Sequence, residues 1–422
     1  MKILLKSIGC RLNEAELQST ACDFNKLGHS ITNSIDDANI VIINSCAVTA
    51  EAERKSRKLI RKIYRDNPLI KVVVTGCYAT LKPEEIAEKI GADLVIDNKN
   101  KDKIAAIVSE KLDIAAVSAH AAEANESTLF KRGMDRAFVK IQDGCRYSCA
   151  YCIVTVARGE ERSRTTTEII NEINNLHNNG INEVVLTGVH IGGYGSDTNS
   201  NLPILITEIL KNSNIPRIRL SSLEPWDLTP ELLNLFKDRR MMPHLHLPIQ
   251  SGSDTVLKRM RRRTDSTTFI KSLAMARNEI PDLEVSTDII AGFPGETDTE
   301  WQQTLEFVKK CIFSTIHIFA FSPRAGTVAA EMPDKISPHI IKQRTEELAK
   351  LSEQIASESI EKYIGKTFPV LFEGKADNNR LSGYTPNFIR ASVRTDTNTN
   401  LAGKIIDVEI TGCDEGSLIG KT

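Results

Sequence analysis

The chain has 422 residues, nine of them cysteine, and its 54 basic and 55 acidic side chains leave a formal net charge of −1. This length suffices for two or three domains with their own cores, and the near-zero charge argues against a protein that coats nucleic acid through charge alone. No apolar stretch approaches membrane-spanning length. We expect no secretory leader, and the sparse cysteines argue against a disulfide framework, so a soluble cytoplasmic protein is expected.

The first segment, residues 1–115, alternates the patterns of strands and helices. Strands are expected at 2–8, 40–44, 71–75 and 93–96, and helices at 13–27, 50–64 and 83–90. This β-α-β rhythm predicts an α/β fold of the Rossmann or flavodoxin-like kind, in which helices cover both faces of a parallel sheet. Residues 116–130 are rich in alanine, serine and acidic side chains and are predicted to be a linker.

Residues 131–360 repeat the alternation on a larger scale. Six strands are expected, at 138–141, 183–187, 217–221, 245–248, 284–290 and 315–321. They predict a partial (β/α)6 barrel, which would gather active groups at the carboxyl ends of its strands. From 363 to 422 the pattern changes to short strands broken by Gly, Asn and Asp, at 367–373, 388–393 and 404–411. This last segment predicts a small, OB-like antiparallel β-barrel.

A loop with three cysteines, Cys145, Cys149 and Cys152, is the most informative local feature. Three thiolates can hold three irons of a [4Fe–4S] cluster and leave the fourth iron open, whereas clusters that only carry electrons normally have four cysteine ligands. Structural zinc and redox-active thiols are the alternatives. A zinc site usually brings a second C-x-x-C or paired histidines nearby, and none follows here.

Three further cysteines, Cys10, Cys46 and Cys77, each come directly after a predicted strand of the first sheet. Loops that follow parallel strands share one edge of the sheet, so these thiols can meet in space. A single cysteine at such a place is more often a small buried core residue, but the repeated placement favours a second ligand set. The remaining cysteines are assigned to helix packing, for Cys22 and Cys311, or to no role, for Cys413.

Together these features resemble the radical S-adenosylmethionine (SAM) methylthiotransferases, and the resemblance covers essentially the whole chain. It is carried by Asn44-Ser-Cys46, Thr75-Gly-Cys77-Tyr, Asp143-Gly-Cys145, Arg158-Gly, Arg162-Ser-Arg164, Ser221-Ser-Leu-Glu-Pro225, Gln250-Ser-Gly252 and Gly292-Phe-Pro-Gly-Glu296. Within the family, the motifs around His190, His244-Leu-His246 and Gly383-Tyr-Thr-Pro-Asn387 look most like the branch that modifies N6-threonylcarbamoyladenosine (t6A) in tRNA. Thr155 departs from the proline common in relatives, which puts the rigidity of the loop in question.

The resemblance implies that Cys145, Cys149 and Cys152 hold a [4Fe–4S] cluster whose open iron binds SAM. It implies that the first three cysteines hold an auxiliary [4Fe–4S] cluster that carries the sulfur. In the family reaction a methylthio group replaces the hydrogen on adenine C2 at tRNA position 37, two SAM molecules are consumed, and a flavodoxin or ferredoxin donates electrons. That C–H bond is unactivated, so the cofactors carry the hard step and no side-chain acid or base is assigned.

Contacts with SAM are expected from the residue before the last cluster cysteine and from residues at strand ends. These are Tyr151, Gly188, Glu224, Gln250, Ile290, Gly292 and Arg324. Two of them have structural alternatives. Gly292 could belong to a tight βα turn, and Arg324 could form a surface ion pair.

Basic residues concentrate after Cys46 and after Gln250, and solvated helix faces are the alternative to phosphate contacts there. The C-terminal segment, which resembles a TRAM domain, adds side chains able to stack on an unpaired loop. The expected contacts with the tRNA anticodon loop are Arg57, Arg61, Arg261, Arg262, Tyr384, Asn387 and Arg390. Three other functions stay open: methylthiolation of isopentenyl-adenosine tRNA, methylthiolation of a ribosomal-protein side chain, and an iron–sulfur or zinc RNA-binding module without catalysis.

Overall fold

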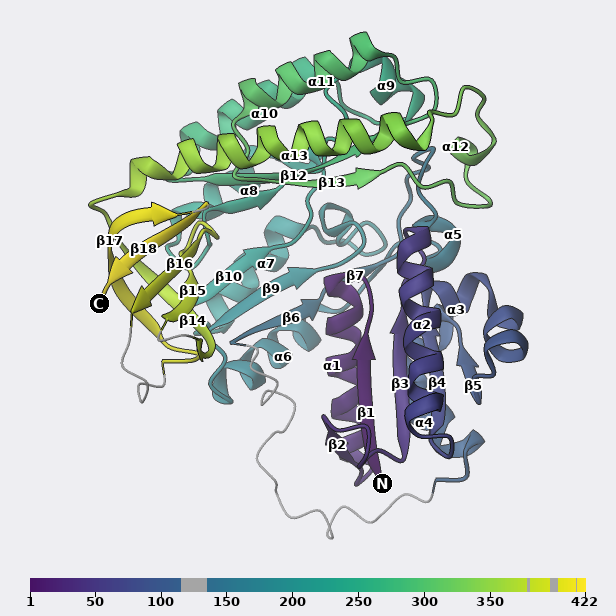
Figure 1. The fold of residues 1–422 in the computed structure, drawn as a ribbon. Coiled ribbons are helices and arrows are strands. Elements are labelled where there is room, and N and C mark those ends of the chain that lie inside the picture. The colour runs from purple at the N-terminus through teal and green to yellow at the C-terminus, as the bar shows by residue number, and fades with distance from the viewer. Residues whose placement is uncertain (115–134, 378–379, 395–400, 415) are drawn as a thin grey trace.

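The computed structural model describes residues 1–114, 135–377, 380–394, 401–414 and 416–422. The linker predicted at 116–130 lies outside the described residues. Figure 1 shows the first sheet and its helices at the lower right, a larger strand-and-helix body above and behind it, and a small barrel at the left. None of the described helices is long and apolar enough to cross a membrane.

The first sheet has five parallel strands in the order β2-β1-β3-β4-β5. The central strands are buried on both faces, which explains why they read as continuous apolar runs rather than alternating ones. The sequence predicted this sheet except for its short edge strand β2. The strands are β1 (Lys2–Ser7), β2 (Ser30–Thr32), β3 (Ile40–Ser45), β4 (Lys71–Gly76) and β5 (Leu94–Ile96). The helices are α1 (Arg11–Lys26), α2 (Ala50–Asp66), α3 (Cys77–Leu81), the π-helix η1 (Glu85–Ile90), the 3₁₀ helix η2 (Asn98–Lys103) and α4 (Ile104–Lys111).

Six parallel strands form the predicted partial barrel. They pair as β10-β9-β6 and β11-β12-β13, and the two groups are joined by single bridges such as that between Ser222 and His246. Because all six are parallel, their carboxyl ends open at the same end of the barrel. The strands are β6 (Arg136–Lys140), β9 (Glu183–Thr187), β10 (Arg217–Leu220), β11 (His244–His246), β12 (Glu284–Ala291) and β13 (Thr315–Ala320).

Helices cover the outside of this barrel, and the long helix α13 (Pro338–Ile360) lies along β13 (Figure 1). Capping boxes begin two of the helices: Thr165 with Glu168 at α6, and Thr297 with Glu300 at α11. Besides α13, the helices of this domain are α5 (Val154–Arg158), α6 (Thr166–Asn178), α7 (Leu202–Asn212), α8 (Pro230–Asn234), α9 (Asp254–Arg259), α10 (Ser266–Glu279), α11 (Asp298–Cys311) and α12 (Val328–Glu331). Short elements are β7 (Gln142–Asp143), β8 (Arg162–Ser163), η4 (Ile191–Gly193), η5 (Pro225–Asp227), η6 (Leu235–Lys237) and η7 (Glu361–Tyr363).

The C-terminal segment forms a closed barrel in the order β14-β15-β16-β18-β17. All pairings are antiparallel except that of β16 with β18, which is parallel. The sequence predicted the barrel but not β15 or β18, because Gly383 and Gly420 interrupt their apolar patterns. The strands are β14 (Thr367–Asp377), β15 (Arg380–Tyr384), β16 (Arg390–Arg394), β17 (Ile405–Asp414) and β18 (Ser417–Lys421).

A buried charge cluster joins the two barrels. The carboxylate of Glu183 is fully buried and lies 3.1 Å from Arg219 Nε, 3.6 Å from Arg217 Nη1 and 3.8 Å from Arg136 Nε. Arg217 also donates to the carbonyl of Tyr384, at 3.3 Å, and Arg136 pairs with Glu373. Burial raises the pKa of Glu183, but Arg219 and Arg136 outweigh it and lower that pKa to about 2. Burial lowers the pKa of Arg217 to about 10, and the nearby guanidiniums of Arg219 and Arg136 add to this, while Glu183 opposes it.

We expect this cluster to control acid stability. The guanidiniums stay charged in acid, so the pH dependence follows Glu183 alone: its stabilisation is complete above about pH 4.5 and is lost as the pH falls towards about 2. The shift corresponds to about 3 kcal/mol. Glu183→Gln should lower the free energy of unfolding at neutral pH and flatten its decline below pH 4.5, measured by denaturant unfolding across pH. A matched change at the surface, Glu208→Gln, should leave both unchanged; equal acid profiles for all three proteins would contradict this role.

Candidate active site

The three dispersed cysteines of the first sheet meet at one edge. Cys10 precedes α1, Cys46 follows β3 and Cys77 opens α3. The three lie close together, because Cys77 raises the pKa of Cys10, and Cys10 and Cys77 both raise that of Cys46. The chain at Gly9 passes so near Cys46 that an added Cβ would lie 2.8 Å from Cys46 Sγ, and φ of +111° also favours glycine there. We call these thiols the sheet trio.

The chemistry of the sheet trio fits an iron–sulfur cluster. Burial raises the pKa of Cys46 to about 11 and also raises that of Cys10, while Arg158 lowers both. Thiols of this kind stay protonated until a metal replaces the proton. The guanidinium of Arg158 would then offset the negative charge of the thiolates. Two side-chain amides form hydrogen bonds with the sulfurs. Asn13 Oδ1 accepts from Cys10 Sγ at 3.7 Å, and Asn98 Nδ2 donates to Cys77 Sγ at 3.8 Å.

The second set, Cys145, Cys149 and Cys152, lies in the loop between β7 and α5, and we call it the loop trio. Backbone bonds fold this loop: Cys145 N–H donates to Gly159 O and Cys152 N–H to Cys149 O. Burial, with smaller contributions from neighbouring thiols, raises the pKa of Cys145 to about 11 and that of Cys152 to about 12. Arg262 Nη1 lies 3.8 Å from Cys149 Sγ and supplies a cation here. The donor set again fits a cluster. Thr155 stabilises the loop by donating its hydroxyl to Tyr147 O, at 2.9 Å.

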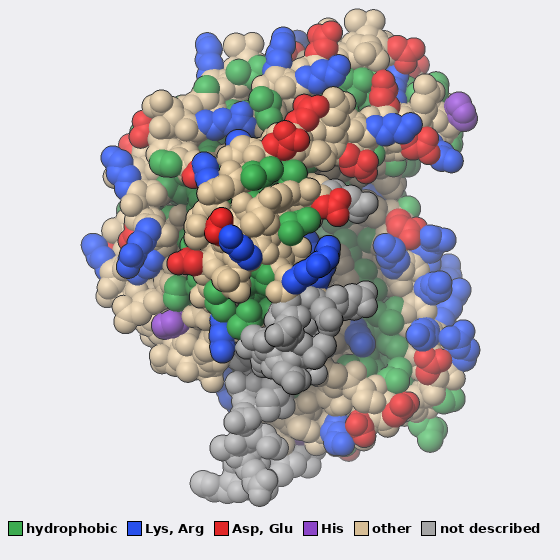
Figure 2. All heavy atoms as spheres, turned by 60° about the vertical axis from the view of Figure 1, so that its left-hand side comes forward, with side chains coloured by type: hydrophobic (Ala, Val, Ile, Leu, Met, Phe, Trp, Pro, Cys, Tyr) green, Lys and Arg blue, Asp and Glu red, His purple; other side chains and the backbone are tan. Residues whose placement is uncertain are grey.

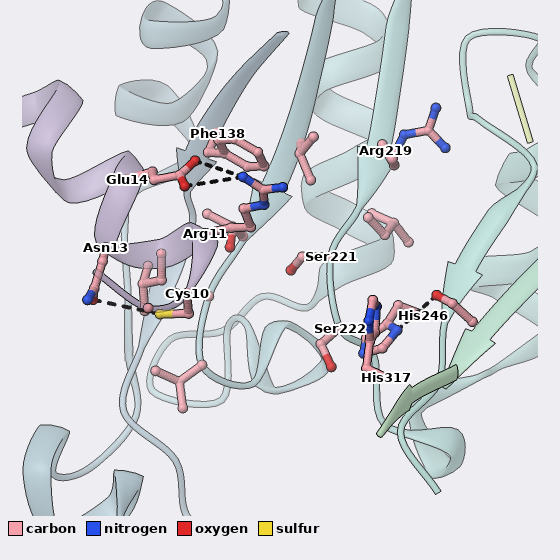
Figure 3. A pocket seen from close by; sticks show the side chains of 18 of the residues that line it. Cys10, Arg11, Asn13, Glu14, Phe138, Arg219, Ser221, Ser222, His246 and His317 are labelled. Carbon is pink, nitrogen blue, oxygen red and sulfur yellow. Dashed lines mark hydrogen bonds and ion pairs between the residues drawn. The ribbon is translucent and has the colours of Figure 1, made fainter. Parts of the chain in front are cut away.

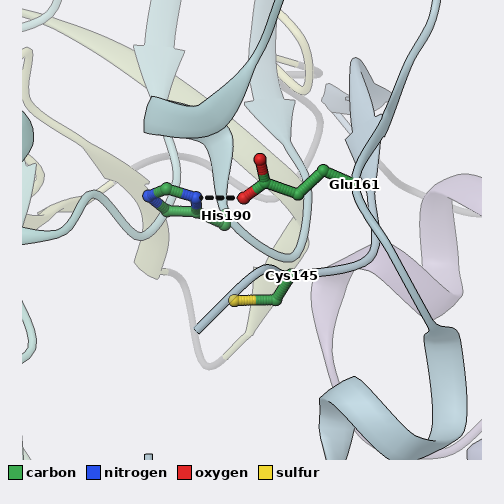
Figure 4. Close-up of side chains that lie close together, drawn as sticks. All are labelled: Cys145, Glu161 and His190. Carbon is green, nitrogen blue, oxygen red and sulfur yellow. Dashed lines mark hydrogen bonds and ion pairs between the residues drawn. The ribbon is translucent and has the colours of Figure 1, made fainter. Parts of the chain in front are cut away.

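The zinc alternative for this loop finds little support in its surroundings. His190 and Glu161 do come close to Cys145, as Figure 4 shows. Both ring nitrogens of His190 are nevertheless committed to carboxylates, Nδ1 to Glu161 at 2.7 Å and Nε2 to Asp227 at 2.8 Å. Neither nitrogen is free to complete a zinc site with the three thiols.

Arg158 ties the two trios together. Its guanidinium donates to Glu16 Oε1 in the first domain at 2.8 Å, to Asp143 Oδ1 beside the loop trio at 2.9 Å, and to Asn13 Oδ1 at 3.0 Å. Lys101 Nζ lies 2.5 Å from the other oxygen of Glu16. Burial raises the pKa of Glu16, but Lys101 and Arg158 outweigh it and hold that pKa well below its usual range. In the sequence, Arg158 and Asp143 stood out only as parts of motifs, and Glu16 and Lys101 gave no signal.

A cavity of about 750 Å³ extends from the sheet trio through the strand ends to the C-terminal barrel. Figure 3 shows Cys10 on one side of it and His246 and His317 on the other. The cavity is also lined by Gly188, which follows β9, and by Tyr384 and Phe388 of the C-terminal barrel. The three domains therefore build one chamber.

Three of the predicted SAM-contacting residues follow successive barrel strands. Gly188 follows β9, and a Cβ there would lie 2.9 Å from Gln142 O. Glu224 follows β10 and pairs with Arg262, at 3.1 and 2.5 Å. Gln250 follows β11 with φ of +78° and bridges to Ile289 of β12. Their contacts with SAM stay predictions.

The other four predicted SAM contacts lie in different surroundings: two in an apolar cluster, one in a turn and one in a buried ion pair. Tyr151 packs against the small apolar cluster that contains Ile290, beside the loop trio. Gly292 has φ of +79° and its N–H donates to Glu296 Oε2 at 2.8 Å, which is the turn that the sequence left as the alternative. Arg324 is buried and pairs with Glu53, so its ion pair joins the barrel to α2 and is not at the surface.

The predicted RNA contacts differ in their exposure to solvent. Arg61, Arg261 and Arg390 are exposed, Arg57 is half-buried, and Tyr384 stacks on Phe388 with ring centroids 4.7 Å apart. Two predictions need correction, because the side chains do not face solvent. Arg262 is buried against Glu224, and Asn387, 1% exposed, accepts from Thr385 Oγ1 at 2.6 Å within the barrel.

A groove along α2 collects the first group of basic side chains. It is lined by Arg54, Arg57, Lys58, Arg61, Lys62 and Arg65. Among the described residues, no ion pair reaches Lys58, Arg61 or Lys62. Figure 2 shows a column of Lys and Arg side chains down the right-hand side, at the height that α2 has in Figure 1.

Comparisons with known proteins agree with this architecture. Family models match at residues 139–308 (radical SAM superfamily), 2–97 (uncharacterized protein family UPF0004) and 361–422 (TRAM domain). The threonylcarbamoyladenosine tRNA methylthiotransferase MtaB of Bacillus subtilis is 35% identical, over 97% of this chain and 93% of that protein. The tRNA-2-methylthio-N(6)-dimethylallyladenosine synthase of Bacillus velezensis is 32% identical, over 99% and 85%. The solved radical SAM methyltransferase TsrM of Kitasatospora setae, 14% identical, shares the fold with a TM-score of 0.57 over 90% of this chain and 80% of that one.

If each trio binds its own cluster, removing one trio should remove only the iron of that cluster. Anaerobically reconstituted protein should hold about eight irons per chain, and replacing either whole trio by alanine should leave about four. Loss of the loop trio should also abolish SAM cleavage, while loss of the sheet trio should leave it measurable. Cys413→Ala is the matched control and should keep about eight irons. Iron and sulfide analysis with EPR spectroscopy checks this, and a triple variant that retains both signals would contradict the assignment.

Proposed function

This chain belongs to the radical-SAM methylthiotransferases of the MtaB type, and on that premise we propose that it converts t6A at position 37 of tRNA to its 2-methylthio derivative. The cavity carries the proposal. It joins the sheet trio, the expected place of the sulfur, to a chamber wall built by the C-terminal barrel. Curated relatives named for the same substrate, 35% and 36% identical, support the choice of t6A.

Two [4Fe–4S] clusters, one at each trio, and two molecules of SAM would supply the radical and sulfur chemistry that no side chain of this protein can provide. The protein's own task is to hold these parts at a fixed separation. Arg158 does so by binding Glu16 of one domain and Asp143 of the other. A buried, fully hydrogen-bonded ion network of this kind favours one relative position of the domains.

Within the barrel, side chains beyond the cysteines orient the loop trio. Tyr147 packs edge-on against His190 and Trp226, with centroids 4.8 and 5.3 Å away, and accepts a hydrogen bond from Trp226 Nε1 at 3.2 Å. Arg262 lies over Trp226 while it binds Glu224. An electron donor such as a flavodoxin or ferredoxin would deliver electrons to the loop trio.

The substrate would approach across one basic surface and one aromatic surface. The helix α2 begins four residues after Cys46, so phosphates bound in its groove would bring the anticodon loop near the sheet trio. At the far side of the chamber, Tyr384 and Phe388 offer stacked aromatic rings to an unpaired base.

The reaction is tested on a synthetic anticodon stem-loop that carries t6A. Reconstituted protein with SAM and a reductant should produce the mass increase of one methylthio group on that nucleoside, observed by mass spectrometry. The variant without the sheet trio should cleave SAM without forming product. The same RNA carrying isopentenyl-adenosine should react at least tenfold more slowly. Equal or faster conversion of that RNA would move the function to the second group of relatives, and absence of product from both RNAs would refute methylthiolation.

RNA binding should depend on the α2 groove. The substitutions Lys58→Ala, Arg61→Ala and Lys62→Ala together should weaken tRNA binding and reduce the slope of log affinity against log salt, by about 0.7 for each phosphate that the variant no longer neutralises. A control with Lys309, Lys310 and Lys342 changed to alanine removes as many exposed cations from α11 and α13. Fluorescence anisotropy over a salt series distinguishes the two, and identical slopes would show that the groove is only a solvated surface.

A further inference from the structure

One group of polar side chains in the chamber has no role in the chemistry described so far. Three adjacent strands bring together His246 of β11, Asp288 of β12 and His317 of β13, with their polar atoms within 4.8 Å of one another. The register explains the meeting, because His246 pairs with Ser286 while Asp288 pairs with His317. All of them line the cavity, and Figure 3 shows His246 and His317 side by side, across from Cys10.

Hydrogen bonds around His246 define which of its ring nitrogens carries the proton. Ser286 Oγ lies 3.1 Å from His244 Nε2 and 2.9 Å from His246 Nδ1, and one hydroxyl can donate only once. His246 Nε2 lies 3.2 Å from the carboxylate of Asp288, which can only accept. The consistent arrangement runs from His244 N–H to the Ser286 oxygen, from the Ser286 hydroxyl to His246 Nδ1, and from His246 Nε2–H to Asp288. It leaves His244 Nδ1 as an acceptor, and that buried atom has no partner among the described residues.

Two polar groups that line the cavity have no hydrogen-bond partner among the described residues. Among the described residues, no hydrogen bond reaches the ring of His317, although it lies 5.4 Å from that of His246. Ser221 Oγ is buried without a hydrogen bond to any described residue, and Ser221 also lines the cavity. A buried hydroxyl without a partner is costly and indicates a ligand or water at that place.

The chemistry of this wall matches a polar substituent better than an apolar one. An amino-acid substituent on adenine N6 carries an anionic carboxylate, an N–H and, for threonine, a hydroxyl. His317 and Ser221 can donate to the carboxylate, and the second oxygen of Asp288 can accept from the hydroxyl. An isopentenyl group would offer no hydrogen bond to any of the three, at a cost of the kind that separates hydroxyl-recognising sites from apolar ones.

Resting on the proposed function, we propose that His317, Asp288 and Ser221 form the subsite that binds the carboxylate- and hydroxyl-bearing substituent of the target adenine. His246 is a positioning residue because it binds Asp288 directly, and His244 is one because it acts on His246 through Ser286. The subsite thereby decides which hypermodified adenosine is accepted. It lies opposite the sheet trio, so a base held between the two would have its N6 substituent turned away from the sulfur.

The test compares binding of three anticodon stem-loops that differ only at position 37, which carries t6A, isopentenyl-adenosine or adenosine. Anaerobic anisotropy with cluster-loaded wild type should show t6A RNA binding at least about tenfold more tightly than adenosine RNA, which corresponds to about 1.4 kcal/mol. His317→Gln and Asp288→Asn should each remove most of that preference and leave the affinity for adenosine RNA unchanged. His339→Gln, at an exposed position of α13, is the matched control and should behave as wild type.

Iron content and SAM cleavage report whether each variant is folded and loaded, and Ser221→Ala provides a smaller change if the others fail to fold. Unchanged preference in folded variants overturns the subsite. Wild type that forms product without preferring t6A RNA also overturns it, while the proposed function stands. Wild type that forms no product refutes the function instead. A protein that lacks both trios yet binds one zinc or iron through His246, Asp288 and His317 would make the group a metal site and overturn the proposal.

Discussion

The structure depends on one buried guanidinium. Arg158 leaves the barrel at the end of α5, enters the first domain, and finds Glu16 and Asn13 there while it keeps Asp143 of its own domain. Removing Glu16 would leave Arg158 and Lys101 without their shared buried carboxylate, which costs far more than the loss of a surface ion pair. The two cysteine trios lie on either side of this contact. Their separation is therefore set by short hydrogen bonds within the protein and not by the flexible reach of a connecting segment.

Much of this could be predicted from the sequence because the signals are local and repetitive. Apolar runs spaced by helices indicated both parallel sheets, and the rule that parallel strands share an edge brought Cys10, Cys46 and Cys77 together. Strand-end placement was likewise correct for Gly188 and Gln250. These inferences needed only periodicity and topology.

What the sequence could not predict depends on contacts between distant segments. Arg262 lies in a basic run and was predicted to bind phosphate, yet its side chain is buried and forms an ion pair with Glu224. Asn387 resembled an exposed loop residue, but it is buried against Thr385. His317 gave no signal at all, since its meaning comes from the β12–β13 register. Exposure and pairing are tertiary properties, and a charge pattern along the chain does not determine them.

The aromatic pair on the C-terminal barrel has a consequence for how this molecule can be divided. Arg136 and Arg219 lie over the ring of Phe388, and Arg217 donates to the backbone of the same barrel. Residues 361–422, which match the TRAM domain model, are thus a structural wall of the chamber. Excising them would expose the guanidinium cluster around Glu183 to water and open the chamber on that side. A shortened protein would therefore leave the chamber open to solvent, even with all six cysteines of the two trios still in place.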